Sequence, residues 1–158
     1  MTGLLERKEV VELAKMYASK RFLCSESVLL AVSDWLGVKS ELIPKIATGL
    51  GAGIGGRGTI CGALSGGVIA LGLVFGRKDP VIEEGRRPYW FAQELFKQFK
   101  EKFGSVMCAD ITGCDISTEE GRKSYSEKKM WDTKCSQCIQ EATGIVMEII
   151  VKNSIAKS

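Results

Sequence analysis

Histidine is absent from this sequence of 158 residues. Because histidine is the usual general base near neutral pH, its absence excludes the Ser-His and Cys-His catalytic pairs. It also excludes histidine-containing zinc sites and histidine ligation of haem. The sequence has no Cys-x-x-Cys-His motif for covalent haem attachment, and no Gly-Lys-Ser/Thr closes its glycine-rich segment, which excludes a P-loop.

Regular alternation of apolar and polar residues, the pattern of a half-buried strand, is also missing, and no period of 20 to 50 residues repeats. The net charge of +3, from 22 basic and 19 acidic residues, is too small to indicate binding to nucleic acid. A chain of this length can bury a large core as one domain. The sequence therefore predicts a single all-α domain over residues 1–158.

The N-terminal stretch MTGLLERKEVVELAK interleaves acids and bases and has no apolar core of a secretory signal. We therefore expect a cytoplasmic, reducing location, where cysteines serve metal or thiol chemistry. Residues 59–75 are uncharged and approach the about 20 residues that a membrane helix needs. Four glycines interrupt that stretch, however, so we favour a helix at the centre of a bundle over a membrane span.

Helical periodicity covers most of the chain. Residues 4–22, 24–36 and 89–103 each place apolar residues on one face, and a last apolar face follows Cys138. The pattern predicts one compact bundle of five or six helices, with a glycine-rich loop before a central apolar helix. The start signals are Thr59 as an N-cap, Asp79-Pro80 with Glu83 and Glu84, and Ser117 with Glu120 as a capping box; the glycine stops are Gly37 and Gly104.

The glycine-rich loop contains Gly51-x-Gly53-x-x-Gly56, which matches the dinucleotide-binding fingerprint. That fingerprint requires a strand before the first glycine and a βαβ unit around it. The preceding stretch, ELIPKIATGL, contains a proline and is not rich in β-forming residues. We therefore favour a glycine-rich turn without a nucleotide.

Six cysteines are the candidates for chemistry, and four of them lie at predicted helix starts. These four are Cys24, Cys61, Cys108 and Cys138, and the other two are Cys114 and Cys135. A helix N-terminus lowers the pKa of a thiol and donates N–H hydrogen bonds to its sulfur. Four thiolates directed at one place can hold an iron-sulfur cluster. For any single cysteine, burial as a small apolar side chain is the simpler interpretation.

Cys135-x-x-Cys138 is a closely spaced cysteine pair. Such a pair suits a dithiol of the thioredoxin kind, half of a zinc site, or no function. A thioredoxin fold needs strands around the motif, and no strand is predicted. The spacing of the cysteines alone leaves these alternatives open.

The order of the motifs resembles the C_GCAxxG_C_C family of redox-active proteins. Cys24-Ser-Glu-Ser-Val is followed by the glycine-rich bend, by Cys61-Gly62-Ala63-x-x-Gly66, by Cys108 after a Phe-Gly, and by a cysteine that opens the last helix. The resemblance covers about residues 6 to 152. It implies a small helical redox domain of anaerobic bacteria and archaea, sometimes encoded near transporters. Related domains in split-Soret-type cytochromes are associated with an iron-sulfur cluster.

The resemblance assigns Cys24, Cys61 and Cys108 directly, and it assigns the fourth position to Cys138 rather than Cys135. The reason is that the apolar face after Cys138 keeps the phase of the family's last helix. Cys114 and Cys135 are additional to the pattern; either could replace a ligand as an alternate, resolve a disulfide or have no role. Gly55, Gly56 and Gly62 would let the backbone approach a cofactor closely.

The leading hypothesis is a cytoplasmic electron-transfer protein with a [2Fe-2S] or [4Fe-4S] cluster on these four cysteines. It is an electron carrier or redox-active module rather than an enzyme that turns over a substrate. Its partner would be a redox protein, and a homodimer is compatible with the sequence. The alternatives are a metal-free thiol-disulfide oxidoreductase, using Cys135 and Cys138 or a pair that folding brings together, and a transport-accessory module that binds a metal or chalcogen species.

Overall fold

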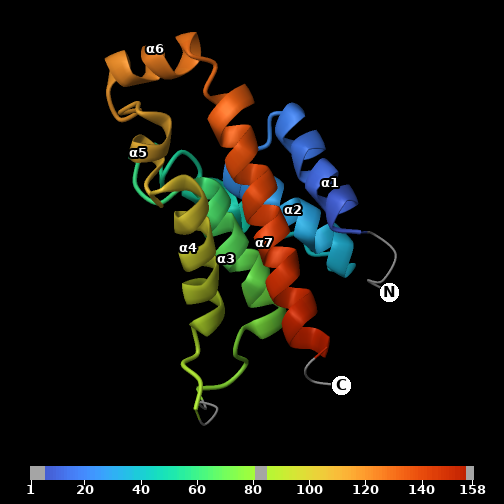
Figure 1. Cartoon of the computed structure of the whole chain (residues 1–158). Coiled ribbons are helices and arrows are strands. Elements are labelled where there is room, and N and C mark those ends of the chain that lie inside the picture. The colour runs from blue at the N-terminus through green and yellow to red at the C-terminus, as the bar shows by residue number, and fades with distance from the viewer. Residues whose placement is uncertain (1–5, 81–84, 156–158) are drawn as a thin grey trace.

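The computed structural model describes residues 6–80 and 85–155, and over these residues the protein is a bundle of helices (Figure 1). The elements in chain order are α1 (Arg7–Ser19), α2 (Cys24–Leu36), the 3-10 helix η1 (Lys45–Leu50), α3 (Gly62–Phe75), α4 (Trp90–Phe103), α5 (Cys108–Thr112), α6 (Glu119–Glu127), the π-helical turn η2 (Trp131–Cys135) and α7 (Ser136–Ile155). The predicted all-α fold, with a glycine-rich loop before a central apolar helix, is confirmed.

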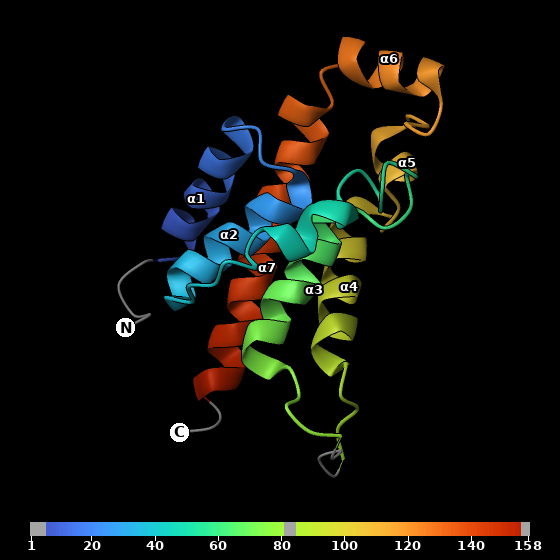
Figure 2. The ribbon, with the colours of Figure 1, turned by 180° about the vertical axis from the view of Figure 1, so that it is seen from behind.

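The long helix α7 runs along the bundle and packs against α1, α2, α3 and α4 (Figures 1 and 2). Its predicted apolar face is buried, with Ile139 and Val146 fully inaccessible to solvent. These positions are seven residues apart, two turns of a helix, and therefore lie on one side. The same spacing made this helix recognisable in the sequence.

The central helix α3 is apolar on every side and packs against α2, α4 and α7. Its glycines allow close packing: a Cβ added at Gly66 would lie 2.3 Å from the carbonyl oxygen of Ser25 on α2. At Gly67 an added Cβ would lie 2.9 Å from Leu95 on α4. Within residues 6–80 and 85–155, no helix combines the length and apolarity of a membrane span.

Two predicted helix caps are wrong, one by two residues and the other by one. Helix α3 begins at Gly62 with Cys61 as its N-cap, because Thr59 is held in the preceding turn by a 2.6 Å hydrogen bond from its hydroxyl to the carbonyl of Gly53. Helix α6 is capped by Thr118, whose hydroxyl accepts the amide of Gly121 at 2.9 Å. Ser117 is not the cap, because its hydroxyl donates to Asp115 instead.

The other helix boundaries agree with those predicted from the sequence, with two differences. The first helix is shorter than predicted, Arg7–Ser19, and its predicted start at residues 4 and 5 lies outside the described residues. Residues 78–80 form a bend rather than a helix start, residues 81–84 lie outside the description, and α4 begins at Trp90. Gly37 and Gly104 end α2 and α4 in the left-handed conformation, as predicted.

The glycine-rich loop contains a left-handed turn. Five consecutive residues, 52–56, have positive φ angles between 53° and 74°. Among the described residues the backbone pairs in β fashion only at an isolated antiparallel bridge between Ile60 and Met107. The βαβ unit that a dinucleotide site requires is therefore not formed around these glycines.

Tyr17 on α1 donates a hydrogen bond to the carboxylate of Asp34 on α2 and links the two helices. This bond, with burial, raises the pKa of Tyr17 to about 12. Because a hydrogen bond to a charged group is worth about 1.5–3 kcal/mol and this one is partly exposed, we expect Tyr17→Phe to lower the free energy of unfolding by about 1 kcal/mol at pH 7. The raised pKa means that the folded state keeps this proton longer than the unfolded state. The stabilisation is therefore complete below pH 10 and is lost as the pH rises toward 12.

Urea unfolding of the wild type and Tyr17→Phe at several pH values between 7 and 11.5 measures this effect. The difference in free energy of unfolding between the wild type and Tyr17→Phe should narrow above pH 10. Tyr89→Phe, at an exposed tyrosine, should have a free energy of unfolding close to that of the wild type at every pH. A gap that is the same at pH 7 and pH 11.5 contradicts the assignment.

Candidate functional site

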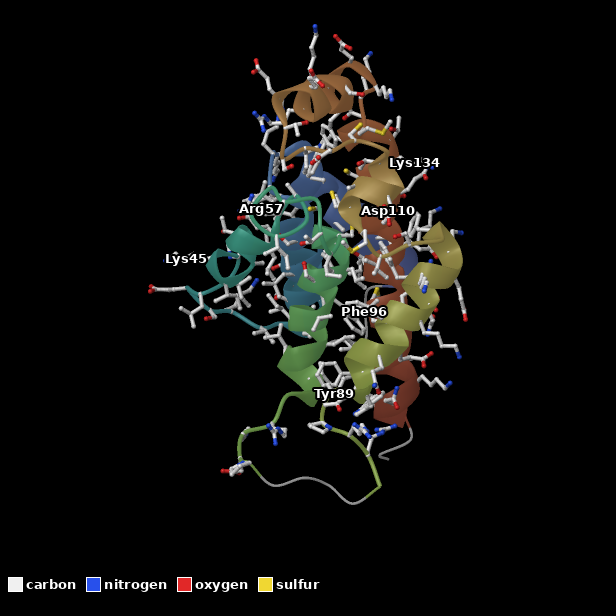
Figure 3. The ribbon with its side chains drawn as sticks, turned by 90° about the vertical axis from the view of Figure 1, so that its left-hand side faces the viewer. Lys45, Arg57, Tyr89, Phe96, Asp110 and Lys134 are labelled. Carbon is white, nitrogen blue, oxygen red and sulfur yellow. The ribbon has the colours of Figure 1, made fainter. Side chains whose placement is uncertain are left out.

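The four cysteines of the sequence hypothesis lie at helix starts near one end of the bundle. Cys24 is the first residue of α2, Cys61 is the N-cap of α3, Cys108 is the first residue of α5 and Cys138 is the third residue of α7. All four are buried, with exposed fractions between 2% and 8%. In Figure 3 the sulfur atoms gather toward the end of the bundle marked by Arg57 and Lys134, and Tyr89 marks the opposite end.

A short antiparallel pairing holds the starts of α3 and α5 side by side. The amide of Cys61 donates to the carbonyl of Val106 at 2.8 Å, and the amide of Cys108 donates to the carbonyl of Thr59 at 2.6 Å. The bridge between Ile60 and Met107 lies between these two bonds. Two cysteines far apart in the sequence are thereby fixed next to each other by backbone hydrogen bonds, which do not depend on any bound group.

Gly62, at the start of α3, has no side chain, and the sulfur of Cys24 lies in the space that this leaves. A Cβ added at Gly62 would lie 2.3 Å from the sulfur of Cys24 and 3.1 Å from the carbonyl oxygen of Leu50. The Cys24 sulfur therefore occupies the space that any other residue at position 62 would fill. The backbone amides of Ala52 and Ser25 donate hydrogen bonds to the Cys24 sulfur, so the left-handed turn directs an N–H group at this cysteine.

The thiols of Cys61 and Cys138 lie close together. Interaction with Cys138 is the main reason why the pKa of Cys61 is lowered, and the backbone amides of Ala63 and Leu64 lower it further. The same interaction, with burial and the nearby Cys61, raises the pKa of Cys138 above its ordinary value.

The other thiols resist ionisation. Burial, and then the proximity of Cys61, raises the pKa of Cys24 to about 11. Burial, followed by the proximity of Cys61, Cys24 and Cys114, raises the pKa of Cys108 to about 12. Cys61 and Cys24 are close enough to Cys108, and to each other, to oppose a second negative charge, so a state with several thiolates requires a positive centre among them.

Cys138 lies in the first turn of α7, as predicted, but its backbone surroundings differ from those of the other three cysteines. The turn η2 runs directly into α7, and the amide of Cys135 donates to the carbonyl of Met130 at 2.9 Å in the π-helical pattern. Cys138 therefore lies within a continuous helical run rather than at a free N-terminus. Backbone N–H groups reach the sulfurs of Cys24 and Cys61 instead.

Of the two additional cysteines, Cys135 belongs to the site. It is half-buried, and its pKa is raised to about 12, first by burial and also by Cys24, Cys61 and Cys108. The hydroxyl of Tyr125 lies 3.0 Å from the sulfur of Cys135. No motif in the sequence signals this tyrosine, which comes from α6, ten positions before the cysteine.

Cys114 is buried beside Cys108 but its sulfur is directed to other partners. It donates to the carbonyl of Thr112 at 3.5 Å and to the hydroxyl of Ser124 at 3.7 Å. Cys114 therefore fastens α6 to the end of α5.

The three glycines of the sequence hypothesis differ from one another. Gly62 contacts a candidate ligand, as described above. Gly55 and Gly56 have positive φ angles, and a Cβ added at either would meet no atom within 4 Å. Their role in close approach to a cofactor stays a prediction.

Over residues 6–80 and 85–155, no three cysteine or carboxylate side chains are arranged to hold a single metal ion. The sulfurs gather without the tight spacing that one ion needs. A zinc site of the kind that Cys135-x-x-Cys138 could begin is therefore not formed in the described part of the chain.

A comparison with protein families decides the affiliation. Residues 22–149 match the family model described as "Putative redox-active protein (C_GCAxxG_C_C)". The chain belongs to the C_GCAxxG_C_C family. The match includes all four candidate cysteines, and membership supports a redox role. The family's name writes the central motif with glycine first, whereas this chain reads Cys61-Gly62-Ala63.

A relative of this C_GCAxxG_C_C chain occurs in Archaeoglobus fulgidus and is described as an uncharacterized protein. The two are 26% identical over 133 residues, which cover 78% of this chain and 82% of the relative. No solved structure matches the chain.

Proposed function

We propose that this protein is a small electron-transfer protein that holds an iron-sulfur cluster through Cys24, Cys61, Cys108 and Cys138. The observation that supports it most strongly is that three other buried thiols, those of Cys24, Cys108 and Cys138, lie close to the buried thiol of Cys61. The Ile60–Met107 bridge, which joins the starts of α3 and α5, and the packing of α2 and α7 against α3 support the proposal.

The residues present fit such a group. Iron-sulfur clusters are ligated by cysteine thiolates, usually four, and the four candidates supply only sulfur donors. Because a cluster contains several metal and sulfide atoms, its protein ligands lie further apart than those of a single ion. When bound, the cluster would supply a one-electron redox centre.

The chain's own residues have three tasks in this proposal. The apolar core contains Cys24, Cys61 and Cys138 and keeps water away from them, and Cys108 is buried beside it. The amides of Ala52, Ala63 and Leu64 donate hydrogen bonds to the ligand sulfurs, which favours their thiolate form. The missing side chain at Gly62 leaves room for the Cys24 sulfur. The expected partner is another redox protein, which donates or accepts the electron.

The contact between Cys61 and Cys138 favours a second candidate, a metal-free thiol-disulfide oxidoreductase. In that case the reactive pair would be Cys61 and Cys138, which folding brings together. The neighbouring Cys135 shares its hydrogen bond with Tyr125 instead.

Metal and sulfide analysis of protein purified without oxygen and reconstituted with ferrous iron and sulfide tests the proposal. We expect a brown protein whose visible absorption is bleached by dithionite. Cys24→Ser, Cys61→Ser, Cys108→Ser and Cys138→Ser should each lower the bound iron about tenfold or more, since each removes a ligand. Cys114→Ser is the matched control, because Cys114 is also buried but is bonded to Thr112 and Ser124.

A colourless, iron-free wild type after reconstitution would contradict the cluster. If thiol titration of that protein then showed the reversible loss of one thiol pair, the second candidate would be supported.

A further inference from the structure

Two cysteines compete for the fourth position of the site. Cys135 and Cys138 are three residues apart on one continuous helical run, so they lie on the same side, about one turn apart. Both are close to Cys24 and Cys61, as the effects on their pKa values show. Some feature of the fold must therefore decide which of the two sulfurs joins the other three.

The two sulfurs differ in their hydrogen-bond partners. Cys138 is 2% exposed and its thiol lies close to that of Cys61, inside the site. Cys135 is half-buried and its sulfur shares a 3.0 Å hydrogen bond with the hydroxyl of Tyr125. Tyr125 thus holds the sulfur of Cys135, while the sulfur of Cys138 contacts a ligand.

Tyr125 comes from a helix that has little other contact with the bundle. Figures 1 and 2 show α6 beyond the end of the bundle at which α5 and the glycine-rich loop lie. Gly121 is the buried residue of α6, and Ser124 is fastened by the thiol of Cys114. Packing in the hydrophobic core therefore does not explain why Tyr125 is turned toward Cys135.

The backbone next to this contact is unusual. Residues Trp131–Cys135 form a π-helical turn, and Lys129 has a φ of 51°. π-Helical turns inside helices are rare and often occur at functional sites. Here the turn sets the direction of Cys135 relative to the regular helix that carries Cys138.

From these observations we propose that Tyr125 is a positioning residue that selects the fourth ligand: its hydroxyl holds the sulfur of Cys135 on the α6 side, so that Cys138 completes the site. Removal of the hydroxyl frees Cys135 to take the place of Cys138. This inference rests on the proposed function where it concerns iron. Its geometric content, which sulfur can reach Cys61, does not depend on iron.

Disulfide mapping of the metal-free protein tests this geometric content. Diamide converts two thiols to a disulfide and is itself reduced to the hydrazine, and peptide mass spectrometry identifies the partner of Cys61. In the wild type we expect Cys61 to pair with Cys138. In Cys138→Ser we expect little pairing of Cys61 with Cys135, and in Cys138→Ser/Tyr125→Phe the Cys61–Cys135 disulfide should increase about tenfold. Cys138→Ser/Tyr17→Phe is the matched control and should resemble Cys138→Ser.

Iron content and the visible spectrum after reconstitution give the second measurement. Cys135→Ser should match the wild type, Cys138→Ser should lose iron, and Cys138→Ser/Tyr125→Phe should regain it with a changed spectrum. A cluster lost in Cys135→Ser would overturn the selection. The selection would also be overturned if Cys138→Ser and Cys138→Ser/Tyr125→Phe formed equal amounts of the Cys61–Cys135 disulfide, or if neither protein formed it. An iron-free wild type with the expected disulfide pattern would reject the cluster and leave the positioning role supported.

Discussion

Gly62→Ala is expected to destabilise the protein by about 1–3 kcal/mol and to abolish iron binding, because the new methyl group overlaps the sulfur of Cys24. The added Cβ would lie 2.3 Å from that sulfur and 3.1 Å from the Leu50 carbonyl, so neither neighbour leaves it room. The sulfur can escape only by turning away from the site. Thermal unfolding of the metal-free protein measures the first effect, and iron analysis after reconstitution measures the second.

The same helix provides the control for this variant. A Cβ added at Gly72 of α3 would meet no atom within 4 Å. Gly72→Ala should therefore stabilise the helix by about 0.5–1 kcal/mol, the usual gain of alanine over glycine in a helix interior, and leave iron binding unchanged. If the two variants behaved alike, helix propensity rather than contact with Cys24 would govern position 62.

The fold was largely predictable because its helices are long and one-sided. In α4 and α7 the apolar residues repeat with the helical period, and glycines in the left-handed conformation end α2 and α4. The errors at Thr59 and Ser117 have a common cause. Each side chain had a second hydrogen-bond partner, Gly53 or Asp115, that local sequence rules do not foresee.

The site was predictable only as a set of cysteines. Backbone N–H groups reach Cys24 and Cys61 as expected, but the pKa is lowered only at Cys61 and is raised at Cys24, Cys108 and Cys138. A π-helical turn precedes Cys138. A π-helical turn leaves no clear pattern in the sequence. The contact between Tyr125 and Cys135 joins α6 to the turn before α7, so it depends on how those segments pack rather than on a motif.

Gly53→Ala is expected to cost about 3 kcal/mol, because it combines a left-handed backbone with a steric clash. Gly53 has a φ of 69°, and an added Cβ would lie 2.5 Å from the backbone nitrogen of Thr59. The amide and the hydroxyl of Thr59 both donate to the carbonyl of Gly53, so the clash also breaks the closure of the turn. The amide of Ala52, which donates to the Cys24 sulfur, should move with it. Urea unfolding and iron analysis after reconstitution measure the two consequences.

Ala52→Gly makes the opposite exchange one position earlier, and it should raise the stability of the protein instead of lowering it. Ala52 has a φ of 53°, a conformation that costs a residue with a side chain about 1–2 kcal/mol more than glycine. The greater freedom of glycine in the unfolded chain offsets about 0.4–1 kcal/mol of that gain. The variant should therefore be more stable than the wild type by about 0.5 kcal/mol, and it keeps the amide that reaches Cys24. If Ala52→Gly bound iron normally while Gly53→Ala did not, the left-handed turn would act by directing that amide at the sulfur. Loss of iron in Ala52→Gly as well would show that the turn must also be rigid.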